Sequence, residues 1–199
     1  MALKLLVGLG NPEARYDMTR HNAGFKMIEK VAIKYGGSLS LSTKLHAEIG
    51  KIKMANHDVM LARPTTYMNL SGKAVAAICN FYKIDKSDIL IIHDEVALPM
   101  GVIRLARGGG GSAGNHGIES IMECLGHKDF QRLRIGVGPD PGGAVRGHFV
   151  LSEIAENDRL LYFKSIDLAI EAAESILREG IQSAMNKFNG IDLREAPVS

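Results

Sequence analysis

Two polar side chains that follow a short apolar run are the first in this sequence that could do chemistry. Residues 3–9 have the length of a buried strand, and Asn11 and His21 follow across a turn rich in glycine and proline. Because a helical pattern covers residues 25–35, with Thr19 as a candidate N-cap, His21 lies where the helix dipole disfavours the imidazolium ion. A neutral histidine accepts protons, and an asparagine beside it can hold a carbonyl group. The alternative is that both residues only cap the strand–loop–helix unit.

Two further polar side chains follow predicted strands. Residues 89–92 are an uninterrupted apolar run, typical of a strand covered on both faces, and Asp94 comes at its carboxyl end. Asn69 lies in a loop after another predicted strand, at 59–63. In α/β proteins, ligands bind beyond the carboxyl ends of parallel strands. The positions of Asn11, Asn69 and Asp94 therefore favour a binding site over simple capping.

Strands and helices alternate along the chain. Apolar patterns predict a hairpin of strands at 46–54 and 59–63, further strands at 102–106 and 133–137, and helices starting near 71, 115, 157 and 181. This order predicts an α/β fold, a three-layer sandwich with a mixed, mostly parallel twisted sheet and helices on both faces. We expect a single catalytic domain over residues 1–199, with C-terminal helices at about 157–189 packed on it.

Composition narrows the class of protein. Apolar residues make up 46% of the chain, but no run approaches the length of a membrane span and none resembles a signal peptide. Cys79 and Cys124 lie far apart on apolar helical patterns, which predicts reduced core thiols in a cytoplasmic protein. The seven histidines form no cluster with metal-ligand spacing, so we expect no metal and no other cofactor.

Charge is distributed unevenly along the chain. The net charge is only +2, yet residues 151–199 hold five basic and nine acidic side chains, so the first 150 residues are basic. This asymmetry suits a basic face for a polyanion. Five basic residues surround two predicted strands and a glycine-rich run: Arg104, Arg107, Lys128, Arg132 and Arg134. An RNA-binding module without catalytic activity is therefore one alternative function.

Two glycine motifs suggest other chemistry. Residues 8–10 resemble the start of a dinucleotide fingerprint, but Glu13 stands where the third glycine belongs, so a phosphate would meet a carboxylate. Residues 110–114 match G-x-S-x-G, with Asp140 and His148 following in hydrolase order, so a serine esterase using Ser112 is a second alternative. However, a run of glycines is too flexible to hold Ser112 in a strained turn. A mobile loop over a ligand is the better interpretation.

Six segments, taken together, resemble the bacterial-type peptidyl-tRNA hydrolase family. They occur in the family's order and span nearly the whole chain, which makes the set more specific than any one motif. The segments are residues 7–12, 19–24 and 64–72, then His93-Asp94-Glu95 with Leu98-Pro99 and Gly101, then Phe130 with residues 132–136, and finally residues 149–152.

The resemblance implies hydrolysis of the ester that joins a peptide to tRNA, by a cytoplasmic protein that we expect to be monomeric. Its partner would be peptidyl-tRNA, bound through the acceptor end and the nascent peptide. His21 would be the general base that activates water, and Asp94 would orient its ring and stabilise its charged form. Asn11 would recognise the peptide-like end, and Asn69 would position the substrate near the reacting carbonyl. Three more side chains would line the cleft: Tyr16, Tyr67 and Met68.

The sequence departs from the family at the start of the helix near residue 115. The family's Gly-His-Asn-Gly is here Gly-Asn-His-Gly, at residues 114–117. Strict register places His116 where the family has an asparagine that contacts tRNA. Asn115, one position earlier, has the same amide side chain and is the alternative contact. An inward His116 would make substrate affinity depend on pH over roughly 5.5 to 8, the titration range of histidine.

A second departure concerns the contacts with tRNA phosphates. Two basic positions of the family correspond to Arg104 and Arg134, but Ala106 stands where a lysine belongs. Arg107 is the nearest substitute, although on a strand it would face the opposite side from residue 106. The resemblance therefore implies that Arg104 and Arg134 contact phosphate, and leaves the role of Arg107 open.

Overall fold

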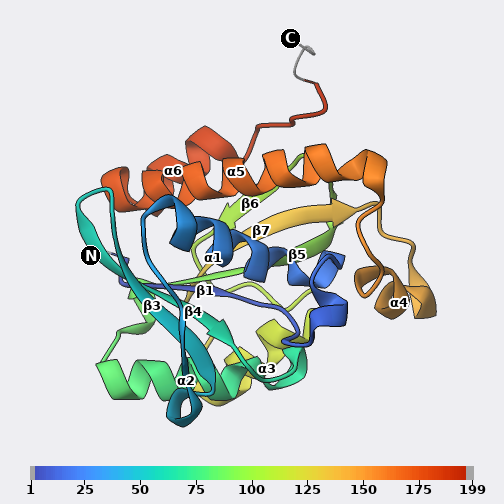
Figure 1. Ribbon diagram of the computed structural model, residues 1–199. Coiled ribbons are helices and arrows are strands. Elements are labelled where there is room, and N and C mark those ends of the chain that lie inside the picture. Colours follow the sequence, from blue (N-terminus) through green and yellow to red (C-terminus); the bar gives the residue numbers. More distant parts are fainter. Residues whose placement is uncertain (1–2, 196–199) are drawn as a thin grey trace.

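A sheet of seven strands with helices on both faces organises the molecule (Figure 1). The computed structural model describes residues 3–195. The strand order is β2-β3-β4-β1-β5-β7-β6, in which the four strands β4, β1, β5 and β7 run parallel and antiparallel pairings flank them. The strands are β1 (Leu5–Gly8), β2 (Ser40–Ser42), β3 (Ala47–Met54), β4 (His57–Pro64), β5 (Ile89–Pro99), β6 (Ile103–Ala106) and β7 (Gln131–Gly138).

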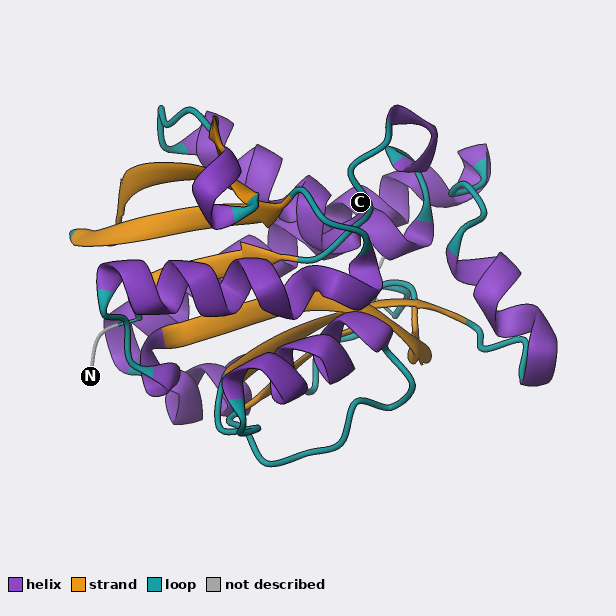
Figure 2. Ribbon diagram, turned by 90° about the horizontal axis from the view of Figure 1, so that it is seen from below, coloured by secondary structure: helices purple, strands orange, loops and turns teal. Residues whose placement is uncertain are grey.

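The helices form the two outer layers of the sandwich. One layer holds α1 (Ala23–Lys34), α5 (Glu156–Glu179) and α6 (Ile181–Phe188), and the other holds α2 (Ser71–Tyr82) and α3 (His116–Leu125). Figure 2 shows α2 and α3 lying side by side across their face of the sheet. The short helix α4 (Arg146–Val150) projects at one end of the molecule, in the connection between β7 and α5 (Figure 1). These layers confirm the α/β sandwich that the sequence predicts.

Strand β1 shows why the sheet needs both layers. Leu6 packs into the core under α1 and α5, while Leu5 and Val7 pack into the core under α2 and α3, and all three are fully buried. Successive side chains of a strand point to opposite faces, so a strand covered on both faces is apolar at every position. The uninterrupted apolar runs in the sequence therefore mark the central strands.

Strand β5 is longer than the sequence predicts. Asp94 was expected at the end of the apolar run, but β5 continues to Pro99 because its backbone still pairs with β7 there. Its pairing with β1 stops at Ile92, opposite Gly8. Asp94 therefore lies beyond the end of β1, although it is inside its own strand.

Two smaller expectations were partly wrong. Thr19 occupies the N-cap position of a 3₁₀ turn, η2 (Arg20–Asn22), that comes before α1, but its hydroxyl donates to the carbonyl of Tyr16 and makes no capping hydrogen bond. Both cysteines are free, but Cys124 is exposed, and only Cys79 is buried. Within residues 3–195, the helices are all too short or too polar to cross a bilayer.

Candidate active site

Close packing of backbones brings the turn that carries His21 onto β5. Gly24 lies in the first turn of α1, and a β-carbon there would be 2.4 Å from both the carbonyl oxygen of Ile92 and the backbone nitrogen of Leu9. A side chain at this position would force α1 away from the sheet. Because Gly24 lacks one, η2 lies directly beside the part of β5 that extends past β1.

His21 and Asp94 form a hydrogen-bonded pair. His21 Nδ1 is 2.9 Å from Asp94 Oδ1, and the side chains are 11% and 3% exposed. A carboxylate only accepts, so Nδ1 carries the hydrogen and Nε2 of the neutral ring keeps its lone pair. The contact across 73 residues of sequence is confirmed, and it leaves a ring nitrogen free to accept a proton.

The pKa of His21 shifts in the direction opposite to the one that the sequence predicts. Burial lowers the pKa of His21, but the charge of Asp94 and the hydrogen bond to it outweigh burial, and the net pKa is raised. Burial also works to raise the pKa of Asp94, yet the contact with His21 lowers it overall. The net shift of the His21 pKa is therefore opposite to the direction expected from the helix terminus alone, because the carboxylate of Asp94 is within hydrogen-bond distance of the ring.

Asn115 also contacts the carboxylate, and His116 does not. Asn115 Nδ2 donates to Asp94 Oδ1 at 3.2 Å, while its Oδ1 caps α3 by accepting from the backbone N–H groups of Gly117 and Ile118. His116 is 71% exposed and its Nδ1 is 3.0 Å from Glu119. Of the two candidates at this helix start, Asn115 is the one that points into the site.

Asn11 is held rigidly by Asn22, a residue that the sequence analysis did not single out. The backbone N–H of Asn11 donates to Asn22 Oδ1 at 2.8 Å, and Asn22 Nδ2 donates to the carbonyl of Asn11 at 3.0 Å. Asn11 Oδ1 in turn accepts from the backbone N–H of Met68 at 2.9 Å. Among residues 3–195, Asn11 Nδ2 has no hydrogen-bond partner, so it is available to a ligand carbonyl.

Two neighbouring cavities meet at η2. The first, of about 280 Å³, contains His21 and Asp94, and its other lining includes Asn115, His116 and residues of α4. The second, of about 630 Å³, contains Asn11 and Asn22. The structure thus places the histidine–carboxylate pair and Asn11 on two sides of one short turn.

The remaining residues that the resemblance places in the cleft lie in different environments, and none of them lines either cavity. Asn69 is exposed on the 3₁₀ turn η4 (Met68–Leu70). Tyr67 is half-exposed and its hydroxyl donates to Glu13, while Tyr16 is partly exposed. Met68 was expected to line the cleft, but its side chain is buried in the core against Gly117. It reaches the site only through its backbone N–H.

The basic residues divide between different environments. Arg104 is opposite Arg134 in the β6–β7 pairing, and Ala106 is opposite Arg132, so these four positions share one face of the sheet. Arg132 is buried, and it donates to the carbonyl oxygens of Gly110 and Gly111 at 2.7 and 2.6 Å. It therefore holds the glycine-rich loop and is not free for a phosphate.

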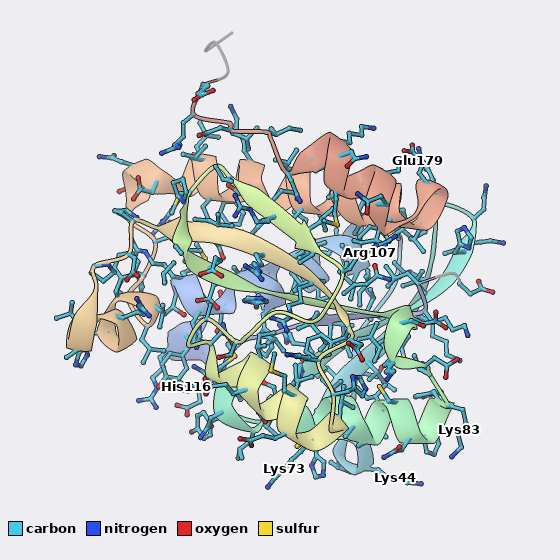
Figure 3. The ribbon with its side chains drawn as sticks, turned by 180° about the vertical axis from the view of Figure 1, so that it is seen from behind. Lys44, Lys73, Lys83, Arg107, His116 and Glu179 are labelled. Atoms are coloured by element: carbon cyan, nitrogen blue, oxygen red, sulfur yellow. The ribbon has the colours of Figure 1, made fainter. Side chains whose placement is uncertain are left out.

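Arg107 does not belong to this basic face. It follows the last residue of β6 and lines a different cavity, of about 720 Å³, together with Glu179 and the start of α6. Figure 3 shows Arg107 on the side of the molecule that carries Glu179 and away from His116. Arg107 therefore does not lie with Arg104 and Arg134, as a substitute for a lysine at residue 106 would have to.

The serine esterase alternative has no catalytic triad. Ser112 Oγ donates to Glu119 at 2.8 Å, Asp140 pairs with Arg146, and His148 is exposed. Within the described part of the chain, no hydrogen bond joins Ser112 to a histidine, and no group of three or more potential ligands is arranged for a metal ion. The polar groups that remain for chemistry are those around His21.

An α/β sandwich with a buried histidine–carboxylate pair beyond the end of its central strand defines a protein suited to general-base hydrolysis. The chain matches the family described as peptidyl-tRNA hydrolase over residues 5–196. It therefore belongs to the peptidyl-tRNA hydrolase family, as the motifs indicated.

Individual relatives agree with this membership. The peptidyl-tRNA hydrolase of Elusimicrobium minutum is 42% identical over 187 residues, which cover 94% of this chain and 99% of that protein. That of Edwardsiella ictaluri is 42% identical over 96% of this chain and 97% of its own length. The crystal structure of peptidyl-tRNA hydrolase from Acinetobacter baumannii superposes with a TM-score of 0.90 at 39% identity, covering 96% of each chain.

Proposed function

We propose that this protein hydrolyses the ester bond between peptide and tRNA in peptidyl-tRNA, using a water molecule that His21 activates. The observation that carries the proposal is the buried pair of His21 and Asp94, joined at 2.9 Å. Nε2 accepts a proton as the water oxygen attacks the ester carbonyl, and Asp94 stabilises the imidazolium that forms. The imidazolium then returns the proton to the departing ribose oxygen. A positioned base of this kind typically contributes about 10²–10⁴-fold.

The asparagines select the substrate in this proposal. Asn11 Nδ2 donates to a carbonyl of the peptide, a group that an unblocked aminoacyl ester lacks at this place. Asn69, exposed on η4, reaches the reacting carbonyl, where one donor to the developing oxyanion contributes about 3 kcal/mol. Amide side chains suit these roles because they donate and accept without titrating. Tyr16, at the end of the 3₁₀ turn Ala14–Tyr16, and Tyr67, just before η4, contact the bound end of the substrate in this proposal.

Arg104 and Arg134 are the proposed contacts for tRNA phosphate. Like charges directly opposite each other on one face of a sheet repel, and Glu95 offsets this only partly, with its carboxylate 3.7 Å from Arg134. A phosphate between the two guanidinium groups would relieve the repulsion. His116, exposed at the start of α3, lines the cavity of His21 but is not required for catalysis in this proposal. We further propose a monomeric, single-domain enzyme that works in the cytoplasm without metal.

One assay tests reaction and specificity together. Purified protein is incubated, with a chelator present, with an N-acetylated aminoacyl-tRNA and with the same aminoacyl-tRNA left unblocked. We expect release of free tRNA from the first substrate only. Binding without turnover would favour the RNA-binding alternative, and release from both substrates would contradict the role of Asn11. Retained activity in Ser112→Ala separates the proposal from a serine esterase.

A further inference from the structure

Arg20, the residue before His21, makes contacts that the proposed chemistry does not use. Its guanidinium Nη1 donates to Ser152 Oγ at 2.7 Å and to the carbonyl of Glu153 at 2.9 Å. The guanidinium also lies over the ring of Phe149, 4.3 Å from its centroid. The backbone N–H of Arg20 donates to the carbonyl of Ser152 at 3.3 Å. One side chain thus joins the catalytic turn to a segment about 130 residues later in the chain.

The backbone on both sides of these contacts is tied together as well. Thr19 forms an isolated antiparallel bridge with Glu153, and the N–H of Ile154 donates to the carbonyl of Met18 at 2.9 Å. The segment 149–154 begins in the last two residues of α4, and its Val150 lines the cavity that contains His21. The contacts of Arg20 therefore connect the turn that carries His21 to a second segment that lines the same cavity.

We propose that Arg20 is a positioning residue that fixes η2, and with it the imidazole of His21, against the segment 149–154. Asp94 holds one ring nitrogen, which sets the tautomer but leaves the backbone of η2 to be fixed by its neighbours. Asn22 fixes one side of His21 through Asn11, and Arg20 fixes the other. This inference rests on the proposed function, because the effect of positioning is measured on that reaction.

Arginine is required for this role by its shape as well as by its charge. A planar guanidinium donates to two oxygens and stacks on an aromatic ring at the same time, whereas the ammonium of lysine is a compact point charge. Arg20→Lys should therefore fail to restore what Arg20→Gln loses. If Arg20 contacted a tRNA phosphate instead, lysine would largely restore it.

Steady-state kinetics on an N-acetylated aminoacyl-tRNA test the proposal. We expect kcat to fall about 10- to 100-fold in both Arg20→Gln and Arg20→Lys, with KM within about threefold of wild type, because misplacing a catalytic group by about 1 Å costs rate of this order. The pH at which kcat is half-maximal should not move, because Asp94 still contacts His21. Arg159→Gln, at an exposed arginine of α5, is the matched control and should be unchanged.

A second set of variants keeps the test decisive. Ser152→Ala removes one acceptor and should lower kcat less than Arg20→Gln, and the double variant should be no worse than Arg20→Gln alone. Wild-type kcat in a folded Arg20→Gln protein overturns the inference. So does a KM that rises in Arg20→Gln and returns to the wild-type value in Arg20→Lys. If Arg20→Gln does not fold, wild-type kcat in both Ser152→Ala and Phe149→Leu overturns it. A wild-type protein that does not cleave overturns the proposed function first, which is a distinguishable result.

Discussion

The two walls of the site are built differently. The inner wall, formed by Asn11, His21, Asn22, Asp94 and the backbone of Met68, is mostly buried. Apart from Asn11 Nδ2, the side-chain groups that hold it bond to one another, to Asn115 or to backbone. The outer wall, formed by Ala113 and Gly114 of the glycine-rich loop with His116 and Arg146, is largely exposed, and its two polar side chains lie against surface carboxylates.

Because of this difference, rearranging the inner wall costs more free energy than rearranging the outer wall. A buried polar group that loses its partner costs about 1–3 kcal/mol, so the inner wall has one arrangement. Exposed ion pairs contribute only about 0–1 kcal/mol, so the outer wall can change its contacts at little cost. The rigid inner wall suits a reaction that needs fixed geometry at the ester. The adaptable outer wall suits a large substrate whose peptide varies.

The largest expected effect is that of His21→Ala. We expect kcat to fall about 10²- to 10⁴-fold, because the rate contribution of a positioned base is lost. Single-turnover cleavage of an N-acetylated aminoacyl-tRNA measures this, with circular dichroism to show that the variant is folded. A folded variant that cleaves at the wild-type rate would remove His21 from the mechanism, and with it the catalytic role of the inner wall.

Asp94→Asn should change the pH dependence as well as the rate. His21 must be unprotonated to act as a base, so activity rises with pH through its pKa. Asp94 raises that pKa, and an amide in its place carries no charge, so the rising limb should move to lower pH. The maximal rate should also fall about tenfold or more, because the ring loses the group that stabilises its protonated form. An unchanged pH–rate profile would contradict the coupling of the pair.

Asn22→Ala tests the rigidity of the inner wall. It leaves the buried N–H and carbonyl of Asn11 without their partners, so the free energy of unfolding should fall by about 1–3 kcal/mol in a urea titration, and kcat should fall with it. The matched variant on the outer wall is His116→Ala, which should change stability by no more than about 0.5 kcal/mol. Equal losses in the two variants would remove the distinction between the walls.

Much of the fold could be predicted because burial leaves a periodic trace in the sequence. The strand–helix order, the hairpin of β3 and β4 and the bounds of α6 all follow from apolar spacing. The extension of β5 past Asp94 left no such trace. His93, Asp94 and Glu95 are polar, and only the pairing of their backbones with β7 keeps them in a strand.

The site was predictable where chemistry limits residue type and unpredictable where side chains bond to distant backbone. His21, Asp94 and Asn11 were found because strand ends and family motifs mark them. Three other side chains donate to backbone carbonyl groups that lie 11 to 133 residues away in the sequence: Asn22, Arg132 and Arg20. Such long-range contacts leave no periodic pattern in the sequence from which they could be predicted. The choice between Asn115 and His116 likewise depends on which of them caps α3.

The smallest effects are expected on the basic face beside the outer wall. Arg134→Gln and Arg104→Gln should each weaken tRNA binding modestly and reduce the slope of log affinity against log salt by about 1, because one phosphate contact is lost. Stability and kcat at saturating substrate should hardly change. Arg107→Gln is the comparison, because Arg107 lines the separate cavity beside Glu179 and should leave the slope unchanged. If Arg107→Gln reduces the slope as much as Arg134→Gln does, the phosphate path extends across the sheet edge, and the basic face is wider than the register of β6 and β7 implies.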